Sequence, residues 1–164
     1  MGTQRRAYEH GHKPKCLVVV DDTPEAERAV YYASRWAARV GGGVVMLRLI
    51  EIEDRNQQWL GVADIMRAEA QEEADAALEK AAQRSRDLTS ITPERVIREG
   101  DPSEQIAEVI DQDVDITKLV LAASTGTEGP GPIITAVAAS AGTFPIPITL
   151  VPGGLSDAEL DALV

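Results

Sequence analysis

The sequence LVLAASTGTEGPGPIITAVAAS, residues 119–140, changes character twice along its length. Its first five residues form an unbroken apolar run, which is typical of a strand buried on both faces of a parallel sheet. A loop of small residues, hydroxyls and prolines follows, and from Pro132 onward the composition predicts a helix with proline at its first position. This order of strand, loop and helix N-terminus can hold an anion, because backbone N–H groups and the positive end of the helix dipole face the loop.

The rest of the chain repeats this alternation of strands and helices. Apolar runs at residues 16–20 and 44–50 predict two more buried strands, and the segment 95–98 predicts a short, exposed edge strand. Residues 146–151 (IPITLV) predict a last strand that begins at an edge, because proline cannot donate to a sheet. Helical patterns lie between the strands, and the alternation predicts an α/β fold with an open five-stranded parallel sheet and helices on both faces.

Three of the expected helix boundaries rest on specific residues. Thr23 is expected to cap the first helix, with Pro24 at its first position. The second helix is expected from about residue 56 or 59 to residue 88, with a break near Gly61 because thirty residues is long for a globular helix. Asp101 is expected to cap the third helix, with Glu104 completing a capping box.

The chain is expected to form one domain over residues 15–152. Residues 1–14 are polar and lack periodicity, which predicts a flexible N-terminal tail. Residues 153–164 predict a C-terminal helix that opens with a capping box at Ser156 and Glu159 and docks either on the body or on a partner.

Composition excludes several function classes. Asp and Glu number 27 against 16 Lys and Arg, and the net charge of −11 argues against nucleic acid as a partner. The apolar runs are too short for a membrane span of about 18 residues, and no secretory h-region follows the N-terminal charges. We therefore expect a cytoplasmic protein with no membrane partner. The single cysteine, Cys16, excludes a disulfide framework and is expected to be an inert buried residue. His10 and His12 lack a third ligand, so no metal site is predicted.

In open parallel sheets, ligands bind beyond the carboxyl ends of the strands, where the strand order reverses. The residues expected there are Asp21 and Asp22, after the first strand, and residues 123–126, after the fourth. Two interpretations of the aspartates remain open: Asp21 accepts a hydrogen bond from an adenine or ribose group, or the pair only ends a strand and caps a helix. The loop likewise fits an adenine nucleotide, another small ligand or anion, or a purely structural turn.

Four segments resemble universal stress proteins of the UspA type over residues 15–151. They are VVDDTPEAERA at 19–29, VVMLRLIE at 44–51, GDP at 100–102 and PIPITLVP at 145–152. The resemblance implies the sheet order 3-2-1-4-5 and a homodimer through the last strand, residues 146–151. In some members it also implies ATP or AMP between the first and fourth strands, with magnesium if the ligand is ATP; other members bind no cofactor.

The nucleotide-binding members carry G-x-x-G, nine residues, and then G-S or G-T, and this chain departs from that motif. One register places the motif on Ala123, Gly126, Ala136 and Val137, and the other on Gly126, Gly129, Ala139 and Ser140. Pro130 and Pro132 remove N–H donors from the loop, and Glu128 adds a negative charge. The candidate cofactor-binding residues are Asp21, Asp22, Val44, Ala123, Ser124, Thr125, Gly126, Gly129 and Ser140.

The expected function is that of a cytoplasmic, dimeric binding module with a degenerate adenine-nucleotide site. The alternative is a stress protein that binds no nucleotide and acts through its dimer surface and C-terminal helix. An enzyme is the least favoured hypothesis, because the histidines lie only in the tail and no catalytic Ser/His/Asp or Cys/His set is visible.

Overall fold

A computed structural model describes residues 3–51 and 60–164. All five strands pair in parallel in the order β3-β2-β1-β4-β5, which confirms the expected fold class and strand order. The strands are β1 (Lys15–Val19), β2 (Gly43–Ile50), β3 (Glu94–Glu99), β4 (Ile116–Ala123) and β5 (Ile148–Pro152). β3 and β5 lie at the two edges, as their exposed and proline-flanked sequences predicted.

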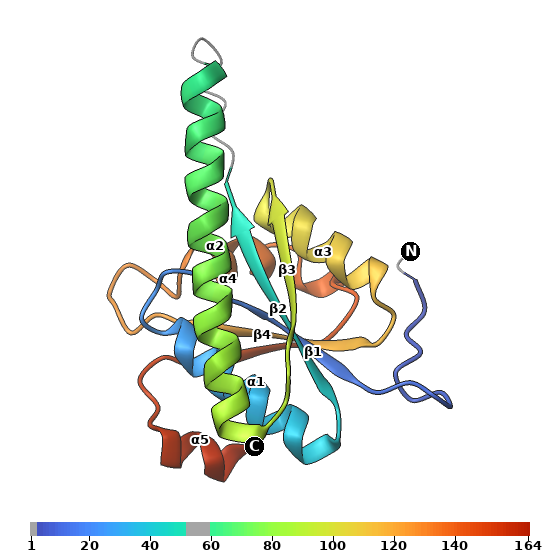
Figure 1. Ribbon diagram of the computed structural model, residues 1–164. Helices are drawn as coiled ribbons and strands as arrows, with labels where there is room; N and C mark the ends of the chain where they lie inside the picture. The colour runs from blue at the N-terminus through green and yellow to red at the C-terminus, as the bar shows by residue number, and fades with distance from the viewer. Residues whose placement is uncertain (1–2, 52–59) are drawn as a thin grey trace.

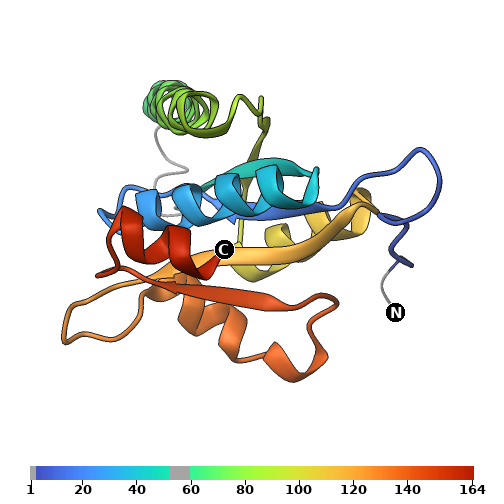
Figure 2. The ribbon, with the colours of Figure 1, turned by 90° about the horizontal axis from the view of Figure 1, so that it is seen from below.

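Helices cover both faces of the sheet (Figures 1 and 2). The helices are α1 (Ala26–Val40), α2 (Leu60–Thr89), α3 (Pro102–Gln112), α4 (Pro132–Ala138) and α5 (Asp157–Leu163). Alternate side chains of each strand point to opposite faces, so the buried residues divide into two clusters. One cluster joins Val18 of β1 to α1, α2 and α5, and the other joins Leu17 to α3 and α4.

The central strand β1 is buried almost along its whole length, as its apolar run predicted. Cys16 is fully buried within it, and burial raises the pKa of its thiol to about 12. The thiol therefore stays protonated at neutral pH, which supports its expected role as an inert core residue.

Helix α2 runs without interruption from Leu60 to Thr89, so the expected break near Gly61 is wrong. Gly61 lies in the first turn, where backbone N–H groups have no partner within the helix and glycine costs little. The expected helix before Leu60 lies outside the described residues. The C-terminal half of α2 packs on the body through Leu78, whereas its N-terminal half extends beyond the sheet and exposes Ile65 (Figure 1).

Residues 3–14 differ from the loose tail that was expected. The guanidinium of Arg5 donates to the carbonyl oxygens of Ile110 (2.6 Å) and Asp113 (2.7 Å), and Ala7 is buried. His12 Nδ1 lies 2.7 Å from Asp115 Oδ1. The last carbonyls of a helix have no partner within it, so the end of α3 offers acceptors that hold this polar segment in place.

Helix α5 docks on the body, against α1, through the buried side chain of Leu160. Both halves of its predicted capping box are present, because Ser156 accepts from the amide of Glu159 and the Glu159 carboxylate accepts from the amide of Ser156. Among the described residues, no helix combines the length and the apolar composition needed to cross a bilayer.

Candidate functional site

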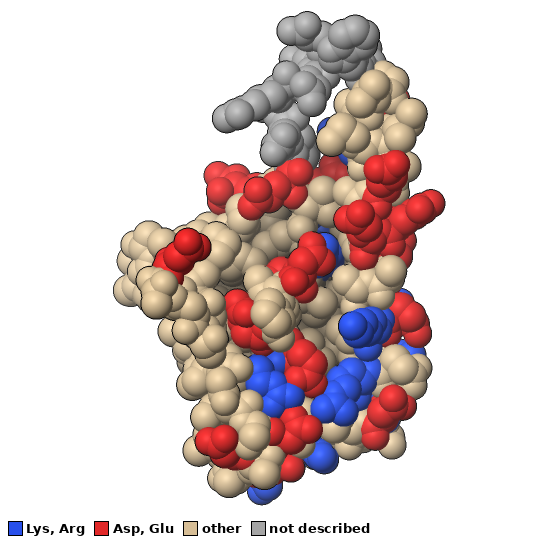
Figure 3. Space-filling view, turned by 90° about the vertical axis from the view of Figure 1, so that its left-hand side faces the viewer, with Lys and Arg blue, Asp and Glu red and all other residues tan. Residues whose placement is uncertain are grey.

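The carboxyl ends of β1 and β4 lie side by side, as the sheet topology predicted. Val18 of β1 is paired with Val120 of β4, so the connections that follow the two strands leave the sheet together. This face of the molecule carries acidic side chains along α2 and around the strand ends, whereas Lys and Arg gather toward α5 (Figure 3). A ligand at the strand ends would therefore meet a mostly acidic surface.

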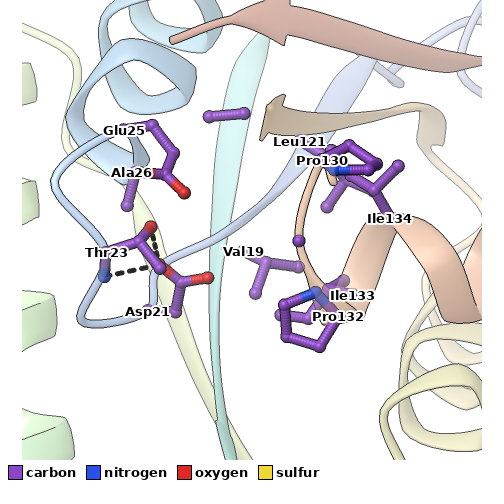
Figure 4. A pocket seen from close by; sticks show the side chains of 12 residues that line it. Val19, Asp21, Thr23, Glu25, Ala26, Leu121, Pro130, Pro132, Ile133 and Ile134 are labelled. Carbon is purple, nitrogen blue, oxygen red and sulfur yellow. Dashed lines mark hydrogen bonds between the residues drawn. The ribbon is translucent and has the colours of Figure 1, made fainter. Parts of the chain in front are cut away.

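The crevice between these ends is nearly full. The side chains of Asp21, Thr23 and Glu25 face it from the β1–α1 connection, and Pro130 and Pro132 face it from the other side (Figure 4). Its free volume is about 20 Å³, which is enough for about one water molecule, whereas small-molecule sites usually offer about 300–1,000 Å³. None of the residues that line it is Lys or Arg. In this conformation the crevice has neither the room nor the charge to hold a nucleotide.

The loop that follows β4 uses its own hydrogen-bond donors. The amide of Ser124 donates to the carbonyl oxygen of Pro130 (3.0 Å), and the amide of Gly126 donates to the Ser124 hydroxyl (3.1 Å). Thr125, Gly126 and Gly129 are exposed at the surface of this loop. Of the loop residues proposed to bind a ligand, Ser124 and Gly126 thus have their amides engaged within the loop itself.

The turn after β5 closes over the end of β4. The amide of Gly153 donates to the carbonyl oxygen of Ala123 (2.9 Å). A Cβ atom on Gly153 would lie 2.5 Å from that oxygen and 2.9 Å from Cβ of Glu25, so only glycine fits here without a shift. The close approach keeps the end of β4 covered by the C-terminal turn.

Asp21 reaches the crevice, but one of its oxygens is occupied. Oδ1 accepts hydrogen bonds from the amide (3.0 Å) and the hydroxyl of Thr23, which is the pattern of an Asx turn. The expected cap at Thr23 is wrong, because α1 begins at Ala26 and residues 23–26 form a separate turn closed by the Thr23 carbonyl. This geometry favours the structural interpretation of Asp21.

Asp22 does not line the crevice and pairs instead with Arg48. Both carboxylate oxygens lie 2.9 Å from Nη2 of Arg48, whose Nη1 donates to the carbonyl oxygen of Val20 (3.2 Å). Arg48 is only 8% exposed, and Asp22, whose side chain is 82% exposed, is its counter-ion at the surface of the molecule. The sequence-based predictions missed Arg48, although its signal was visible as a lone cation within the apolar run VVMLRLI.

Two candidate residues lie away from the crevice. Val44 is buried at the amino end of β2, paired with Cys16, which is the wrong end of the sheet for a ligand. Ser140 follows the C-terminal end of α4, and its hydroxyl donates to the carbonyl of Val137 (3.4 Å). Because α4 begins directly after Gly131, the first motif register places its second pair, Ala136 and Val137, inside that helix, and the second register places its second pair after the helix ends.

Among residues 3–51 and 60–164, no group of three or more His, Cys, Asp and Glu side chains is arranged to hold a metal ion. The crevice residues also include no histidine or cysteine. The polar side chains that line the crevice are those of Asp21, Thr23 and Glu25, which can donate or accept hydrogen bonds there.

Comparison with solved structures gives the same architecture. A universal stress protein from Lactobacillus plantarum superposes with a TM-score of 0.73 at 18% identity, covering 84% of this chain and 97% of the other. A universal stress protein from Archaeoglobus fulgidus, solved in complex with dAMP, gives 0.57 at 18% identity and covers 84% and 96%. An Arabidopsis thaliana member of the family, solved with AMP bound, gives 0.56 at 17% identity and covers 85% and 91%. At these identities the likeness shows the fold alone.

Sequence comparison identifies the family. No curated protein sequence matches the chain significantly. The model of the universal stress protein family matches residues 14–151, which is most of the chain and includes every strand of the sheet except the last residue of β5. This protein therefore belongs to the universal stress protein family.

Proposed function

We propose that this chain is a cytoplasmic, dimeric binding module whose adenine-nucleotide site is degenerate, and that it acts through protein contacts without a tightly bound nucleotide. The observation that carries the proposal is the Pro130–Gly131–Pro132 turn, which fills the crevice between β1 and β4 down to about 20 Å³. Ser124 and Gly126 support it, since in this conformation their amides donate within the loop rather than to a ligand.

The proposal is one of binding rather than catalysis. A general acid or base must lie within hydrogen-bond reach of a substrate, and the crevice leaves no space for one. Its carboxylates belong to Asp21, which is engaged with Thr23, and to Glu25. No catalytic residue is therefore proposed.

Calorimetry tests the proposal directly. AMP and magnesium-ATP are each titrated into the purified protein, and we expect no binding tighter than about 100 μM, or about −5.5 kcal/mol. Gly126→Val is the diagnostic variant, because a Cβ there contacts only the Ser124 side chain at 3.3 Å. Gly142→Val is the matched control, since a Cβ at Gly142 has no neighbour within 4 Å and lies outside the crevice. Binding below about 100 μM that Gly126→Val abolishes and Gly142→Val preserves would overturn the proposal.

A second candidate function is adenylate binding after the loop opens. It is favoured by the two structural relatives that were solved with dAMP and AMP. Gly129 and Gly131 both have positive φ, at 101° and 120°, so the turn around Pro130 depends on two glycines. Opening would have to move Pro130 and Pro132 out of the crevice and free the Ser124 amide from Pro130. Adenylate binding tighter than about 100 μM, sensitive to Gly126→Val, is the outcome that this candidate predicts.

The dimer is proposed to form through β5. This strand is at the edge of the sheet and pairs only with β4 among the described strands, so its other side can pair with another chain. Leu150 is half exposed on it. We expect Leu150→Lys to shift the protein from dimer to monomer in sedimentation velocity, whereas Leu163→Lys, on the exposed face of α5, leaves the dimer intact. A wild-type protein that sediments as a monomer would contradict this part of the proposal.

A further inference from the structure

Three arginines surround one buried tyrosine on the face of the sheet opposite the crevice turn. The guanidinium carbons of Arg28, Arg35 and Arg84 lie 5.4, 5.4 and 5.5 Å from the centre of the Tyr31 ring. The first two come from α1 and the third from α2. Three like charges at one aromatic ring repel one another, so the cluster needs anionic partners nearby.

Helix α5 provides two of the three carboxylates that neutralise this cluster. Arg28 donates to Asp157 Oδ1 at 2.6 Å and to the carbonyl of Leu155 at 2.9 Å. The Tyr31 hydroxyl donates to Asp161 Oδ1 at 2.8 Å. The third carboxylate is Glu27 of α1, which pairs with Arg28 and Arg84. The charge balance of the cluster therefore depends on two acidic side chains of a C-terminal helix.

The pairing of Arg35 with this helix is incomplete. Its Nε lies 3.2 Å from Asp161 Oδ1, but the N–H is not directed at that oxygen and makes no hydrogen bond. Nη1 and Nη2 make only long contacts, to Leu88 O at 3.3 Å and to the Tyr31 hydroxyl at 3.5 Å. The Arg35 side chain is 37% exposed, so its guanidinium is open to solvent and has capacity for a better anionic partner.

A hollow of about 440 Å³ opens beside Arg35, between α1 and α5. It is lined by Arg35, Ala38, Arg39, Asp161 and Val164. Arg35 and Arg39 are four residues apart on α1, so both side chains lie on the same face of that helix. The hollow is open to solvent on one side, so a ligand there would be held mainly by its contacts with the two arginines.

We propose that this hollow binds the phosphate group of a small, free phosphate-bearing molecule through Arg35 and Arg39, and that Asp161 competes with the phosphate for Arg35. Guanidinium groups match phosphate oxygens in both charge and geometry, and two of them on one helix face can contact the same group. Asp161 holds the place of the anion when no phosphate is present. This site is separate from the crevice and does not depend on the state of the crevice.

The test uses inorganic pyrophosphate as the probe, titrated by calorimetry into the full chain. Asp161→Asn removes the competing charge and keeps an oxygen for the Tyr31 hydroxyl, and we expect it to tighten binding about tenfold. Arg39→Gln, at an exposed position, is expected to weaken binding at least fivefold, and Arg35→Gln by a similar factor. Arg67→Gln is the matched control, because Arg67 is an exposed arginine on α2 whose ionic contact is with Glu99 at 3.8 Å.

Each outcome supports the site or overturns it. Loss of affinity in Arg39→Gln but not in Arg67→Gln supports the site, whereas equal losses in both variants would show a general charge effect and overturn it. If Asp161→Asn leaves the affinity for pyrophosphate unchanged, Asp161 does not compete with phosphate for Arg35. If Arg35→Gln fails to fold, the comparison of Asp161→Asn with the double variant Asp161→Asn/Arg39→Gln tests the site by itself, and the proposal requires weaker binding in the double variant. Gly126→Val distinguishes the two sites, because it should not change pyrophosphate binding here, whereas binding in the crevice would be lost.

Discussion

Two hollows of this protein differ in their position relative to the sheet, in their free volume and in the charge of the residues that line them. The crevice between β1 and β4 is where open parallel sheets bind ligands, yet it has about 20 Å³ of free space and no arginine or lysine in its lining. The same rule predicts no ligand site between α1 and α5, yet the hollow there has a volume of about 440 Å³ and is lined by two arginines. The position that the fold favours is thus not sufficient for ligand binding, because the local side chains determine whether any position can accept a ligand.

Substitution of Leu160, which anchors α5, is expected to have the largest effect on stability. The hollow between α1 and α5 exists only while α5 is docked. Leu160 is 1% exposed, and Leu160→Ala should lower the free energy of unfolding by about 3 kcal/mol, the usual cost of a Leu→Ala cavity. Leu163→Ala is the control on the same helix, since Leu163 is 65% exposed. Urea denaturation measures both. Equal effects of the two substitutions would mean that α5 is not docked through Leu160.

The contact between the C-terminal turn and the end of β4 is tested next, at Gly153. Gly153→Ala places a Cβ 2.5 Å from the Ala123 carbonyl oxygen, and this clash with backbone should cost about 2 kcal/mol. Gly154→Ala is the matched control, because its Cβ would make an ordinary contact with Thr125 at 3.5 Å. Thermal denaturation compares the two variants. A stable Gly153→Ala protein would show that the C-terminal turn does not press against the end of β4.

A smaller effect is expected at the ion pair beside the crevice. Asp22→Ala removes the counter-ion of Arg48, and because the Asp22 side chain is 82% exposed we expect a loss of only about 1 kcal/mol. Arg48→Met removes the cation itself, so the double variant should be about as stable as Arg48→Met alone. Additive losses in this double-mutant cycle would show that Asp22 and Arg48 act independently and would leave Asp22 available for another role.

Mild acid should weaken the contact between α5 and α1, and this is the smallest expected effect. The hydrogen bond from Arg28 lowers the pKa of Asp157 below its ordinary value of 3.8. A carboxyl group with a lowered folded-state pKa stabilises the fold above the ordinary value, and this contribution is lost as the pH falls through the folded-state pKa. NMR signals of the Leu160 methyl groups should therefore begin to shift only below about pH 4, as the pH approaches the folded-state pKa of Asp157. If the same pH-dependent change of the Leu160 signals occurs in Asp157→Asn, the titration of another group causes it.

The sheet could be predicted from the sequence because its central strands are continuous apolar runs between clear turn signals. Cys16 and the residues of β1 that follow it are buried on both faces, so little besides hydrophobicity determines their place. The edge strands were predictable for the opposite reason, since exposed residues in β3 and the prolines around β5 suit only an edge.

The side chains and loops that line the two hollows could not be predicted from the sequence in the same way. The path of the loop after β4 depends on the positive φ angles of Gly129 and Gly131, and a glycine in a sequence does not reveal which φ it adopts. The cluster around Tyr31 joins residues that are far apart in the chain, such as Arg28 and Asp157, so no local pattern reveals it. Arg48, which lines neither hollow, was visible in the sequence as a charge inside an apolar strand.

An NMR titration with AMP tests the closed crevice most directly, because each amide reports on its own surroundings. In the ¹⁵N-labelled wild-type protein, the amide signals of Ser124, Gly126 and Gly129 should stay unchanged up to about 1 mM AMP, a concentration at which a ligand bound with about 100 μM affinity would occupy most of the site. Saturable shifts of these three signals, with a dissociation constant below about 100 μM, would show that the crevice opens to a nucleotide and would contradict a site closed by the Pro130–Gly131–Pro132 turn.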